Sequence, residues 1–515
     1  DNPVISTYSV SDLRGGMGLW KYREYKSDDD RYWTGQNIDA LHVGAITLGP
    51  LFTSVGSPAA SANSYSKQML AYNNFLVVLH GSTAATVYHY DGTSWSALID
   101  TLPTTNVLYY DRINFNNRLF WARSGSGYSY QSDQAAVATD VSTPGVISFT
   151  VWDGRIWALD SSFNLYESRS GDSGSWVTRA SLPLTLGAFP YAELHVYIDG
   201  NANSVIWGIT HDGAFIYDLD TDTWMKTELT FMRTQRWPYT VNAYRSAAIN
   251  FKNSLLLRRH FREILKITMQ NGFILAEDIS PDRPDGLEQT LLGNIGSMVA
   301  TTKHVFMVME RIVVNSSARS IIVYNNKGWH PVYVETGISA TQLEIDMAIA
   351  THSAGNSRLY VGNVNGNLYW MDIDIFNDSP LVSTTRTYAS SGLIELPYFA
   401  GGYDAQQKVA IACRIRVAGA TSTETVQIAY RIDGSTGSYT NLGSAITATT
   451  EQTLRFGTNN VGLAFKSIQF RLTLARGGTT TLAPKIEYFA MDYIRLPEVR
   501  KGFQITIDAS AAAPD

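Results

Sequence analysis

Polar turns followed by short apolar runs recur along the middle of the chain. Each copy opens with a turn rich in Asn, Asp, Lys or Gly and continues into an apolar stretch, as in NNFLVVLH and DGRIWALD. The seven copies begin at Asn73, Asn116, Asp153, Asn203, Lys252, Lys303 and Asn356, so that successive starts lie 37 to 53 residues apart. A repeat of this length is typical of one four-stranded blade of a β-propeller.

A second strand follows each copy after a short polar break, for example ATVYHYD from Ala85 and NLYWMD from Asn367. Four units then turn into a tryptophan, at Trp95, Trp176, Trp224 and Trp329. One blade cannot bury both faces of its sheet, whereas blades that pack on one another around an axis can. The pattern therefore predicts a seven-bladed β-propeller over residues 56–383, with a stack of unrelated β-hairpins as the alternative.

Strict alternation of apolar and polar residues replaces this repeat after Pro380. Residues 381–392 are small and polar and are expected to form a linker. In the stretches that follow one face is apolar, at Ile411, Cys413, Ile415 and Val417, at Val426, Ile428, Tyr430 and Ile432, and at Ile468, Phe470, Leu472 and Leu474. A period of two residues means that one face of each strand is buried. We therefore expect an antiparallel, jelly-roll-like β-sandwich over residues 384–498, with Cys413 in its core, and a C-terminal tail over residues 499–515.

The first 55 residues, 1–55, follow neither pattern and are expected to form an extended N-terminal arm. Propellers often close their ring by lending a terminal strand to the last blade, and residues 44–52 (GAITLGPLF) are the candidate for that strand. Arms of this kind become ordered on assembly, so residues 1–40 are expected to be protease-sensitive in a free monomer. The first residues, Asp1-Asn2-Pro3, show neither an initiator Met nor a signal-peptide pattern, as expected for a processed or trimmed end.

Composition agrees with an all-β fold and limits the range of partners. Of the 515 residues, 12% are aromatic and only 17% are charged, a balance that suits strands. The net charge is −6 and no long basic run occurs, so readout of DNA or RNA is not expected. A single cysteine excludes an intrachain disulfide, and no apolar run approaches the ~18 residues of a membrane helix.

Residues with metal-ligand chemistry are present but scattered. The histidines, which show no HxH or HExxH spacing and so do not predict a zinc site, are His42, His80, His89, His195, His211, His260, His304, His330 and His352. Two groups could supply oxygen ligands for calcium, namely Asp28-Asp29-Asp30 and the set Asp372, Asp374, Asn377 and Asp378. Neither has the loop of an EF-hand, so solvated loop acids are the favoured interpretation. No metal-binding, cofactor-binding or catalytic residue is therefore assigned.

Glycosidase chemistry is a second possibility for a propeller, because several glycosidases use this fold. It needs two carboxylates that flank the scissile bond. The segment Ser170–Trp176 is similar to the Asp-box of sialidases but is one residue short before the tryptophan, and such boxes stabilise turns. Acid pairs such as Glu344 with Asp346 more often share a solvated strand face. We therefore expect no enzymatic activity.

Three further features have both a binding and a structural interpretation. The basic cluster Arg258, Arg259, His260 and Arg262 could face an acidic partner or a phosphate, but an exposed strand end and loop is favoured. Sugars could stack on the aromatic rings of Tyr109, Tyr110 and Trp237, but most rings of a propeller are expected to pack between its blades. The pair Gly15-Gly16 is expected to form a backbone turn rather than a phosphate cradle.

Segments near both ends of the sequence resemble one known family, and so does the order of the parts, with the repeats in the middle. Asp12-Leu13-Arg14-Gly15-Gly16 is followed by Gln36-Asn37-Ile38-Asp39 and then by Gly44-Ala45-Ile46-Thr47-Leu48-Gly49-Pro50. This order resembles the opening of many bacteriophage virion proteins, including tail nozzle proteins of short-tailed phages, in which such a segment leads into a propeller. The chain departs from that pattern at Leu48-Gly49, where a basic residue usually precedes the proline. The C-terminal run is similar to sandwich domains that follow propellers in phage structural proteins, and comprises Tyr430–Gly434, Leu442-Gly443, Phe465–Leu472 and Ile486–Pro497.

The resemblance implies a structural component of a bacteriophage tail, of the nozzle or tail-ring type, located in the virion. It implies a homo-oligomeric ring, contacts with other tail proteins, and passage of DNA without specific binding. The low content of Lys and Arg agrees with a passage that does not hold phosphates. A glycan-binding module that recognises a host surface is the alternative, and a propeller glycosidase is a less favoured one.

Overall fold

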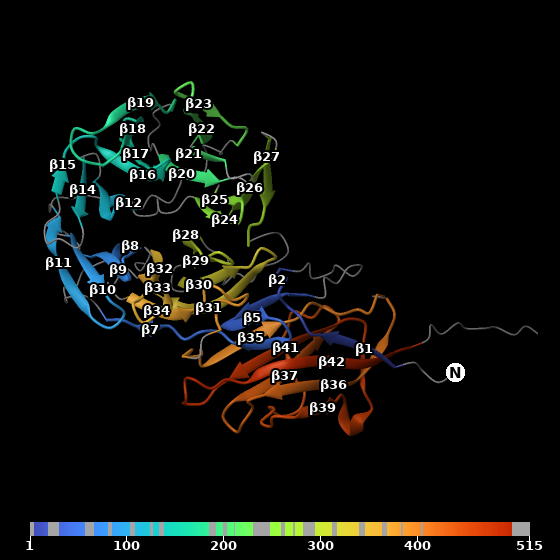
Figure 1. Cartoon of the computed structure of the whole chain (residues 1–515). Helices are drawn as coiled ribbons and strands as arrows, with labels where there is room; N and C mark the ends of the chain where they lie inside the picture. The colour runs from blue at the N-terminus through green and yellow to red at the C-terminus, as the bar shows by residue number, and fades with distance from the viewer. Residues whose placement is uncertain are drawn as a thin grey trace, which may run out of the picture.

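The computed structural model describes residues 5–18, 30–56, 66–80, 85–102, 109–123, 127–132, 139–184, 192–198, 203–210, 212–229, 248–258, 263–270, 273–281, 294–311, 317–338, 346–362, 368–382, 385–402 and 405–496. These residues form an all-β structure, as predicted, and the one helical element among them is the short 3-10 turn η2 (Thr458–Asn460). A ring of small sheets stands beside a second unit made of two larger sheets (Figure 1). Within these ranges no helix is long and apolar enough to cross a membrane.

Four-stranded antiparallel sheets follow one another around the ring as the blades of a β-propeller, so the propeller in the predicted fold class is confirmed (Figure 1). The described residues form seven such sheets, numbered here 1 to 7 in chain order. Sheets 1 and 2 comprise β8 (Ser66–Tyr72), β9 (Phe75–His80), β10 (Ala85–Tyr90) and β11 (Trp95–Leu102), then β12 (Tyr109–Phe115), β13 (Arg118–Arg123), β14 (Gly127–Ser132) and β15 (Thr139–Val141). Sheets 3 and 4 comprise β16 (Val146–Trp152), β17 (Arg155–Asp160), β18 (Asn164–Ser168) and β19 (Val177–Ser181), then β20 (Ala192–Ile198), β21 (Ser204–Thr210), β22 (Gly213–Asp218) and β23 (Thr223–Lys226).

Sheets 5 to 7 complete the ring beside the second unit. Sheets 5 and 6 comprise β24 (Ala248–Phe251), β25 (Ser254–Arg258), β26 (Ile264–Gln270) and β27 (Phe273–Asp278), then β28 (Asn294–Ala300), β29 (Val305–Arg311), β30 (Ser317–Tyr324) and β31 (Trp329–Ile338). Sheet 7 comprises β32 (Met347–Thr351), β33 (Ser357–Gly362), β34 (Leu368–Ile373) and β7 (Thr53–Ser54). The first strands of neighbouring sheets, such as β12, β16 and β20, lie against one another around the axis of the ring.

Hairpin turns explain the repeat in the sequence, because each predicted start lies between the first and second strands of a sheet. Several of these turns need a left-handed backbone. At Asn73 and Asn74 φ is 44° and 66°, and at Asp153 and Gly154 it is 50° and 67°. Asn, Asp and Gly tolerate such angles better than other residues, and two successive positive φ values match the twist of a tight hairpin.

Two larger sheets form the second unit, and side chains of both belong to one apolar core. The seven-stranded sheet comprises β1 (Ile5–Val10), β5 (Ile38–His42), β6 (Ala45–Leu48), β36 (Lys408–Ala418), β39 (Glu451–Arg455), β40 (Leu463–Phe465) and β42 (Lys485–Arg495). The five-stranded sheet comprises β4 (Thr34–Gln36), β35 (Ser391–Glu395), β37 (Thr425–Ile432), β38 (Thr440–Asn441) and β41 (Ile468–Ala475). Phe470 of β41 and Phe489 of β42 meet across the interface with ring centroids 5.0 Å apart. Cys413 is fully buried in the same core, as predicted.

The N-terminal segment is an integral part of this second unit, so the prediction of an extended arm is wrong for its described residues. β1 pairs with β42, β4 pairs with β35, and β6 pairs with β42. These strands lack the repeat of the ring because they belong to other sheets, and their pairing partners lie at the far end of the chain. Residues 1–4 and 19–29, like the tail 499–515, lie outside the described residues.

Two local predictions at the boundary between the units also need correction. The ring is closed by β7, which pairs with Tyr369 and Trp370 of β34, and not by the apolar stretch 44–52. That stretch forms β6 because its apolar side chains need the core of the second unit, whereas β7 joins sheet 7 through its backbone. Residues 381–392 are not a free linker, since Arg386 is buried and Ser391 begins β35.

Candidate functional site

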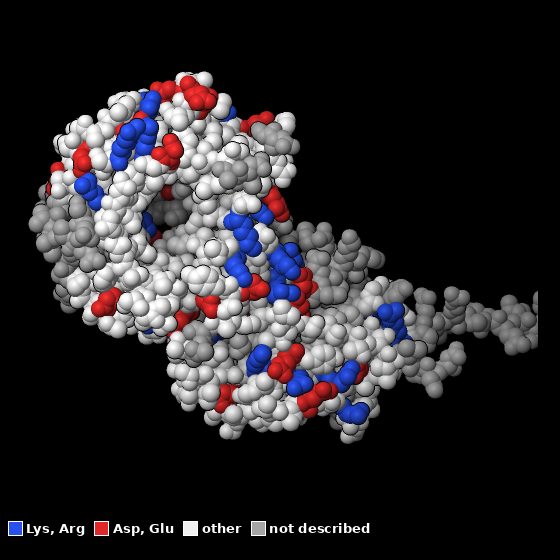
Figure 2. Space-filling model, in the orientation of Figure 1, with Lys and Arg blue, Asp and Glu red and all other residues white. Residues whose placement is uncertain are grey.

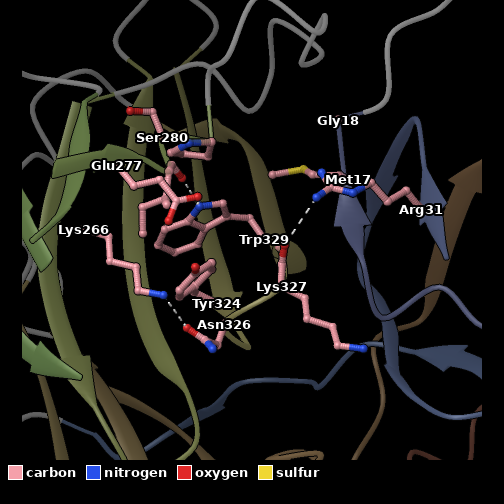
Figure 3. Close-up of a pocket in the computed structure, with 13 residues that line it drawn as sticks. Met17, Gly18, Arg31, Lys266, Glu277, Ser280, Tyr324, Asn326, Lys327 and Trp329 are labelled. Atoms are coloured by element: carbon pink, nitrogen blue, oxygen red, sulfur yellow. Dashed lines mark hydrogen bonds between the residues drawn. The ribbon is translucent and has the colours of Figure 1, made fainter. Parts of the chain in front are cut away.

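A small cavity lies where the N-terminal strands meet the ring. β2 (Gly16–Met17) and β3 (Arg31–Tyr32) form a parallel pair, and β2 lies against β31 of sheet 6. With β26, β27 and the turn between β30 and β31, they enclose a cavity of about 130 Å³ (Figure 3). We call it the junction pocket, and its polar lining residues are Arg31, Lys266, Glu277, Ser280, Asn326 and Lys327.

The side chain of Asn325 fixes the turn between β30 and β31. Its Oδ1 accepts hydrogen bonds from the backbone N–H groups of Lys327 (2.9 Å) and Gly328 (3.0 Å). Its Nδ2 donates to the carbonyl of Arg14 (2.8 Å), which ties the turn to the N-terminal segment. Asn326 follows with a φ of 72°, a left-handed conformation that Asn tolerates. The turn thereby presents Asn326 at the rim of the pocket (Figure 3).

Gly15 and Gly16 bring the N-terminal segment into backbone contact with the same turn. Gly16 has a φ of 85°, and a Cβ atom there would lie 2.7 Å from the backbone nitrogen of Trp329. The N–H of Gly16 donates to the carbonyl of Leu13 (3.1 Å), which confirms the expected backbone turn. Glycine is required here because any side chain would separate the two backbones.

His330 is buried below the turn and joins it to β3. Its Nδ1 lies 3.2 Å from the hydroxyl of Tyr32, and its Nε2 lies 3.2 Å from the carbonyl oxygen of Arg14. Burial lowers the pKa of His330 to about 4 and raises the pKa of Tyr32 well above its usual range. Both groups are therefore uncharged at neutral pH, and they connect β31 to the N-terminal segment through hydrogen bonds.

Aromatic rings form the floor of the junction pocket (Figure 3). Tyr324 and Trp329 lie with ring centroids 4.8 Å apart, and both are almost completely buried. The indole N–H of Trp329 donates to the carbonyl of Ile279 (2.6 Å), so the ring is fixed in place. The floor is thus rigid and apolar.

Charged side chains approach this floor from opposite sides (Figure 3). Lys266 extends from β26 and donates to Oδ1 of Asn326 (3.0 Å), and its cross-strand partner on β27 is Glu277. Arg31 extends from β3 on the other side and donates to the carbonyl of Lys327 (3.4 Å). The pocket therefore combines cations, one carboxylate and an apolar floor, a set that suits a polar ligand with negative charge.

A second group of polar side chains lies on or directly before the inner strands of the ring, at whose centre Figure 2 shows an opening. We call Asp111, Arg112, Ser148, Glu193, His195, Ser297 and Asp346 the channel wall. Asp346 is fully buried and pairs with Arg112 (2.7 Å). It also accepts hydrogen bonds from the backbone N–H of Met69 (2.7 Å) and from the hydroxyl of Ser297 (3.1 Å). This one carboxylate links β8, β12 and β28.

Asp111 forms a similar link between β12, β16 and β20. Its Oδ2 accepts a hydrogen bond from Ser148 (2.9 Å), whose Oγ accepts one from the backbone N–H of Leu194 (3.0 Å). Burial, together with the charge of Glu193, raises the pKa of Asp111 to about 6. Burial lowers the pKa of His195, but Glu193 at 2.9 Å outweighs it and the net pKa is raised. These contacts hold neighbouring inner strands together.

The segment similar to an Asp-box lies in the turn between β18 and β19. The carboxylate of Asp172 accepts a hydrogen bond from Arg118 (2.6 Å), and its carbonyl accepts one from the N–H of Ser175 (3.1 Å). The indole N–H of Trp176 donates to the hydroxyl of Tyr128 (2.7 Å). The segment stabilises a turn, as predicted, and it also links sheet 3 to sheet 2.

The acidic residues near the end of β34 are engaged in turns and ion pairs. Asp374 accepts hydrogen bonds from two N–H groups of the turn that follows it (2.9 and 3.1 Å). Asp378 pairs with Lys303 (2.8 Å), and Asp372 pairs with Arg358 (3.2 Å). In the part of the chain that the structure describes, no group of three His, Cys, Asp or Glu residues is placed to hold a metal ion.

Two interpretations of single residues are wrong. The sequence predicts a solvated face for Asp346 and an exposed strand end for Arg258. Asp346 is buried in the channel wall, and Arg258 is 2% exposed and donates to the carbonyl of Ile295 (2.7 Å). Their partners belong to other sheets, so no local pattern reveals them. The remaining candidates lie outside the described residues, namely Asp28, Asp29, His211, Trp237, Arg259, His260, Arg262 and Glu344, with the side chains of His80, Tyr109 and Tyr110.

Sequence reasoning gave no signal for the junction pocket. Lys266 and Asn326 are ordinary surface residues by pattern, and Arg31 adjoins a polar stretch that the arm prediction covered. The pocket exists because β3 lies against sheet 6. The two segments are far apart in the sequence, since Arg31 donates a hydrogen bond to Lys327, which is 296 positions away. Only the Gly-Gly turn that allows this contact was visible in the sequence.

The known proteins named below resemble this chain only weakly. No protein-family model and no curated protein matches the sequence. Among solved structures, YCF48 from Cyanidioschyzon merolae is 11% identical with a TM-score of 0.39, over 62% of this chain and 98% of its own. The extracellular domain of a hybrid two-component system from B. thetaiotaomicron is 10% identical with a TM-score of 0.43, over 89% of this chain and 63% of its own. The WD40 propeller domain of Doa1 is 7% identical with a TM-score of 0.38, over 62% of this chain and 96% of its own.

Proposed function

We propose that this chain is a non-enzymatic structural subunit of a bacteriophage tail that assembles into a homo-oligomeric ring in the virion. In this proposal the seven sheets are the blades of a closed seven-bladed propeller, and the two C-terminal sheets are a β-sandwich fixed to its side. Its partners are further copies of the chain and neighbouring tail proteins, and DNA passes without specific contacts.

The observation that carries this proposal is the buried joint between the two units. The segment that forms β4, β5 and β6 continues directly into β7, so one stretch of backbone is shared by both. Asp39 of β5 pairs with Arg386 (2.7 Å), and both side chains are buried. Arg386 also donates to the carbonyl of Leu381 (2.9 Å), at the end of the ring. A subunit that has to keep its shape within an assembly gains from such a joint.

Exposed apolar side chains on the outer strands of the ring also support an assembly role. Phe273 and Leu275 of β27 are 74% and 50% exposed, and Met225 of β23 and Val177 of β19 are each 52% exposed. β27 ends its sheet, so its outer backbone groups are not paired within sheet 5. An edge strand with exposed apolar side chains favours contact with another chain.

Electron microscopy of the purified full chain tests the proposal. Closed rings of identical subunits are expected at micromolar concentration, and an antibody against the chain should label the tails of the phage that encodes it. Monomers at every concentration tested, or label on the capsid alone, would contradict the proposal. A turnover assay on model glycosides checks the non-enzymatic part, for which no hydrolysis is expected.

A further inference from the structure

We propose that copies of this chain join edge to edge, with β1 of one subunit pairing antiparallel with β39 of the next, so that their seven-stranded sheets become one continuous sheet. This inference rests on the proposed homo-oligomeric ring and names the contact that builds it. The two strands lie on opposite sides of the same sheet, with β42 and β36 between them (Figure 1).

Both strands have an outer edge with which no other strand pairs among the described residues. In that part of the chain β1 pairs with β42 alone, and β39 pairs with β36 alone. An edge strand is a template for another chain unless charges, prolines or bulges protect it. β1 has the sequence ISTYSV, without charge or proline, and all six residues pair with β42 without a register shift. It therefore lacks the usual protection against strand addition.

The directions of the two edge strands are compatible. From β39 through β36 and β42 to β1, each strand is antiparallel to the one before it. Three such steps separate the two edges, so β39 and β1 run in opposite directions. A copy related by rotation about an axis parallel to the strands therefore brings its β39 antiparallel to β1.

Each edge strand also places an apolar side chain at the margin of the core. Tyr8 of β1 and Leu454 of β39 are partly buried and pack against it. Leu454 pairs with Cys413 of β36. Cys413 and Tyr8 both pair with Met491 of β42, so all four residues lie in one row across the sheet. In a copy rotated without a shift along the strands, Leu454 continues this row beside Tyr8, and the two side chains remove apolar surface from water.

The rows on either side match on the outer face of the sheet. In the same register Thr453 of the next copy adjoins Ser9, and Arg455 of the next copy adjoins Thr7. The hydroxyl of Thr7 donates to Asp492 (2.7 Å), so a carboxylate lies one strand beyond the incoming arginine. Hydroxyl groups thus meet in one row and opposite charges approach in the other, which favours this register.

Pairing of two different edges of the same sheet makes the assembly self-limiting. Such a contact is heterologous, and repeated rotation closes it into a ring. Once the ring is closed, neither β1 nor β39 remains at an edge of its sheet. The same contact without closure would give an open filament.

Disulfide cross-linking of the full chain tests this pairing. Cys413→Ala removes the single cysteine, and Ser9→Cys with Thr453→Cys then places one thiol on each edge strand. Within one copy the two positions are three strand spacings apart, roughly 14 Å, which is too far for a disulfide. Every disulfide therefore joins two copies. Under mild oxidation we expect a ladder of cross-linked multimers that ends at the size of the rings seen by electron microscopy.

Ser9→Cys with Gln452→Cys, in the same Cys413→Ala background, is the matched control. Gln452 neighbours Thr453 in β39 but lies on the opposite face of the strand, so cross-linking should be at least about tenfold weaker. Variants with only one of these cysteines should give no cross-linked product. Circular dichroism melts confirm that each variant is folded.

Hydrogen exchange of the unmodified chain provides a second measurement that needs no substitution. Exchange of backbone N–H groups in β1 and β39 should slow by at least about tenfold on assembly, because their outer edges become paired. β38, at the edge of the five-stranded sheet, should exchange at the same rate in the monomer and in the ring.

The outcomes separate this inference from the assembly proposal. Closed rings without cross-links between positions 9 and 453 overturn the inference and leave the assembly proposal intact. Equal cross-linking in the control pair, or dimers of the variant with Ser9→Cys alone, also overturns it, because the contact is then unspecific or joins two β1 strands. Cross-linked open filaments support the pairing of β1 with β39 and contradict the closed ring. Absence of both rings and cross-links at every concentration contradicts both proposals.

Discussion

The ring and the second unit, called the C-terminal unit below because most of its strands follow the ring in the sequence, are both all-β. Their strands are paired in different ways. In the ring the neighbours of a strand are also its neighbours in the sequence, with β7 as the exception. In the C-terminal unit β1 pairs with β42, so that Ile5 lies opposite Ile494. The apolar residues of sheets 1 to 4 form separate clusters between neighbouring sheets. One large cluster fills the C-terminal unit and reaches into sheets 5 and 6.

The difference shows where the molecule depends on distant parts of the chain. A hairpin closes a short loop at small entropic cost, whereas pairing the two ends of the chain requires nearly all of it to be in place. The C-terminal unit is therefore the part whose stability depends most on single long-range contacts. Changes at the joint should affect it more than the ring.

The largest effect is expected from Asp39→Ala. The substitution leaves Arg386 buried without its carboxylate, and breaking a buried ion pair on one side costs about 3–5 kcal/mol. Calorimetry should show the C-terminal unit unfolding at a lower temperature than the ring. The control Asp220→Ala removes an exposed acid of sheet 4 and should change stability by less than about 0.5 kcal/mol. A single unchanged transition in Asp39→Ala would contradict the role given to the joint.

An intermediate effect is expected from pH, with opposite signs for the buried histidines and for one buried carboxyl group. The pKa of His330 at the joint is about 4 against an ordinary 6.5, so the unfolded chain takes up the proton first. The folded chain therefore loses stability as pH falls from about 6.5 to 4, and His89 in sheet 1 and His304 in sheet 6 add to the same trend. The pKa of Asp111 in the channel wall is raised from 3.8 to about 6, so the folded state binds that proton first. Its contribution to stability therefore increases as pH falls from about 6 to 3.8.

Thermal midpoints measured between pH 4 and 7 separate these contributions. His330→Gln should lose less stability on acidification than the unmodified chain, because one of the groups that favours the unfolded state is gone. Asp111→Asn should lose more, because the compensating carboxyl group is gone. Three parallel curves would show that neither group is coupled to folding.

The smallest effect on stability is expected from Phe273→Ser on the outer edge of the ring. The side chain is 74% exposed, so folding should change by less than about 0.5 kcal/mol. The fraction of assembled rings seen by light scattering should nevertheless fall, because the apolar edge of β27 is lost. Phe376→Ser, at an equally exposed position beyond β34, is the matched control. Equal loss of assembly in both variants would remove the special role of β27.

Patterns confined to a short stretch of sequence predicted much of this structure. The turn residues of the repeat located the hairpins of the ring, because a left-handed backbone selects Asn, Asp and Gly. Alternation located the buried faces of β36, β37 and β41, and it placed Cys413 in a core. In these elements the local sequence alone favours the conformation that the folded chain adopts.

The features that the sequence did not predict all depend on a distant partner. Asp39 and Arg386 are 347 positions apart, and the segment that contains Asp39 gives no indication of its partner. Pattern analysis shows that a stretch such as residues 44–52 needs burial, but it does not show against which sheet. The channel wall was missed for the same reason, because Asp346 acquires its role only through Arg112 of another sheet. Such partners are brought together only by the tertiary structure, so they are identified only when that structure is known.

The position of β7 sets an order of events during synthesis. This strand leaves the ribosome before every other strand of the seven sheets, but Tyr369 and Trp370, with which it pairs, are made last of all in the ring. At 5–20 residues per second, translation of the intervening stretch takes roughly 15–60 s. For that time sheets 1 to 6 can fold while the circle stays open. A product that terminates early therefore keeps an exposed strand edge that chaperones and proteases can recognise. Only a chain that is translated beyond Trp370 can close the ring.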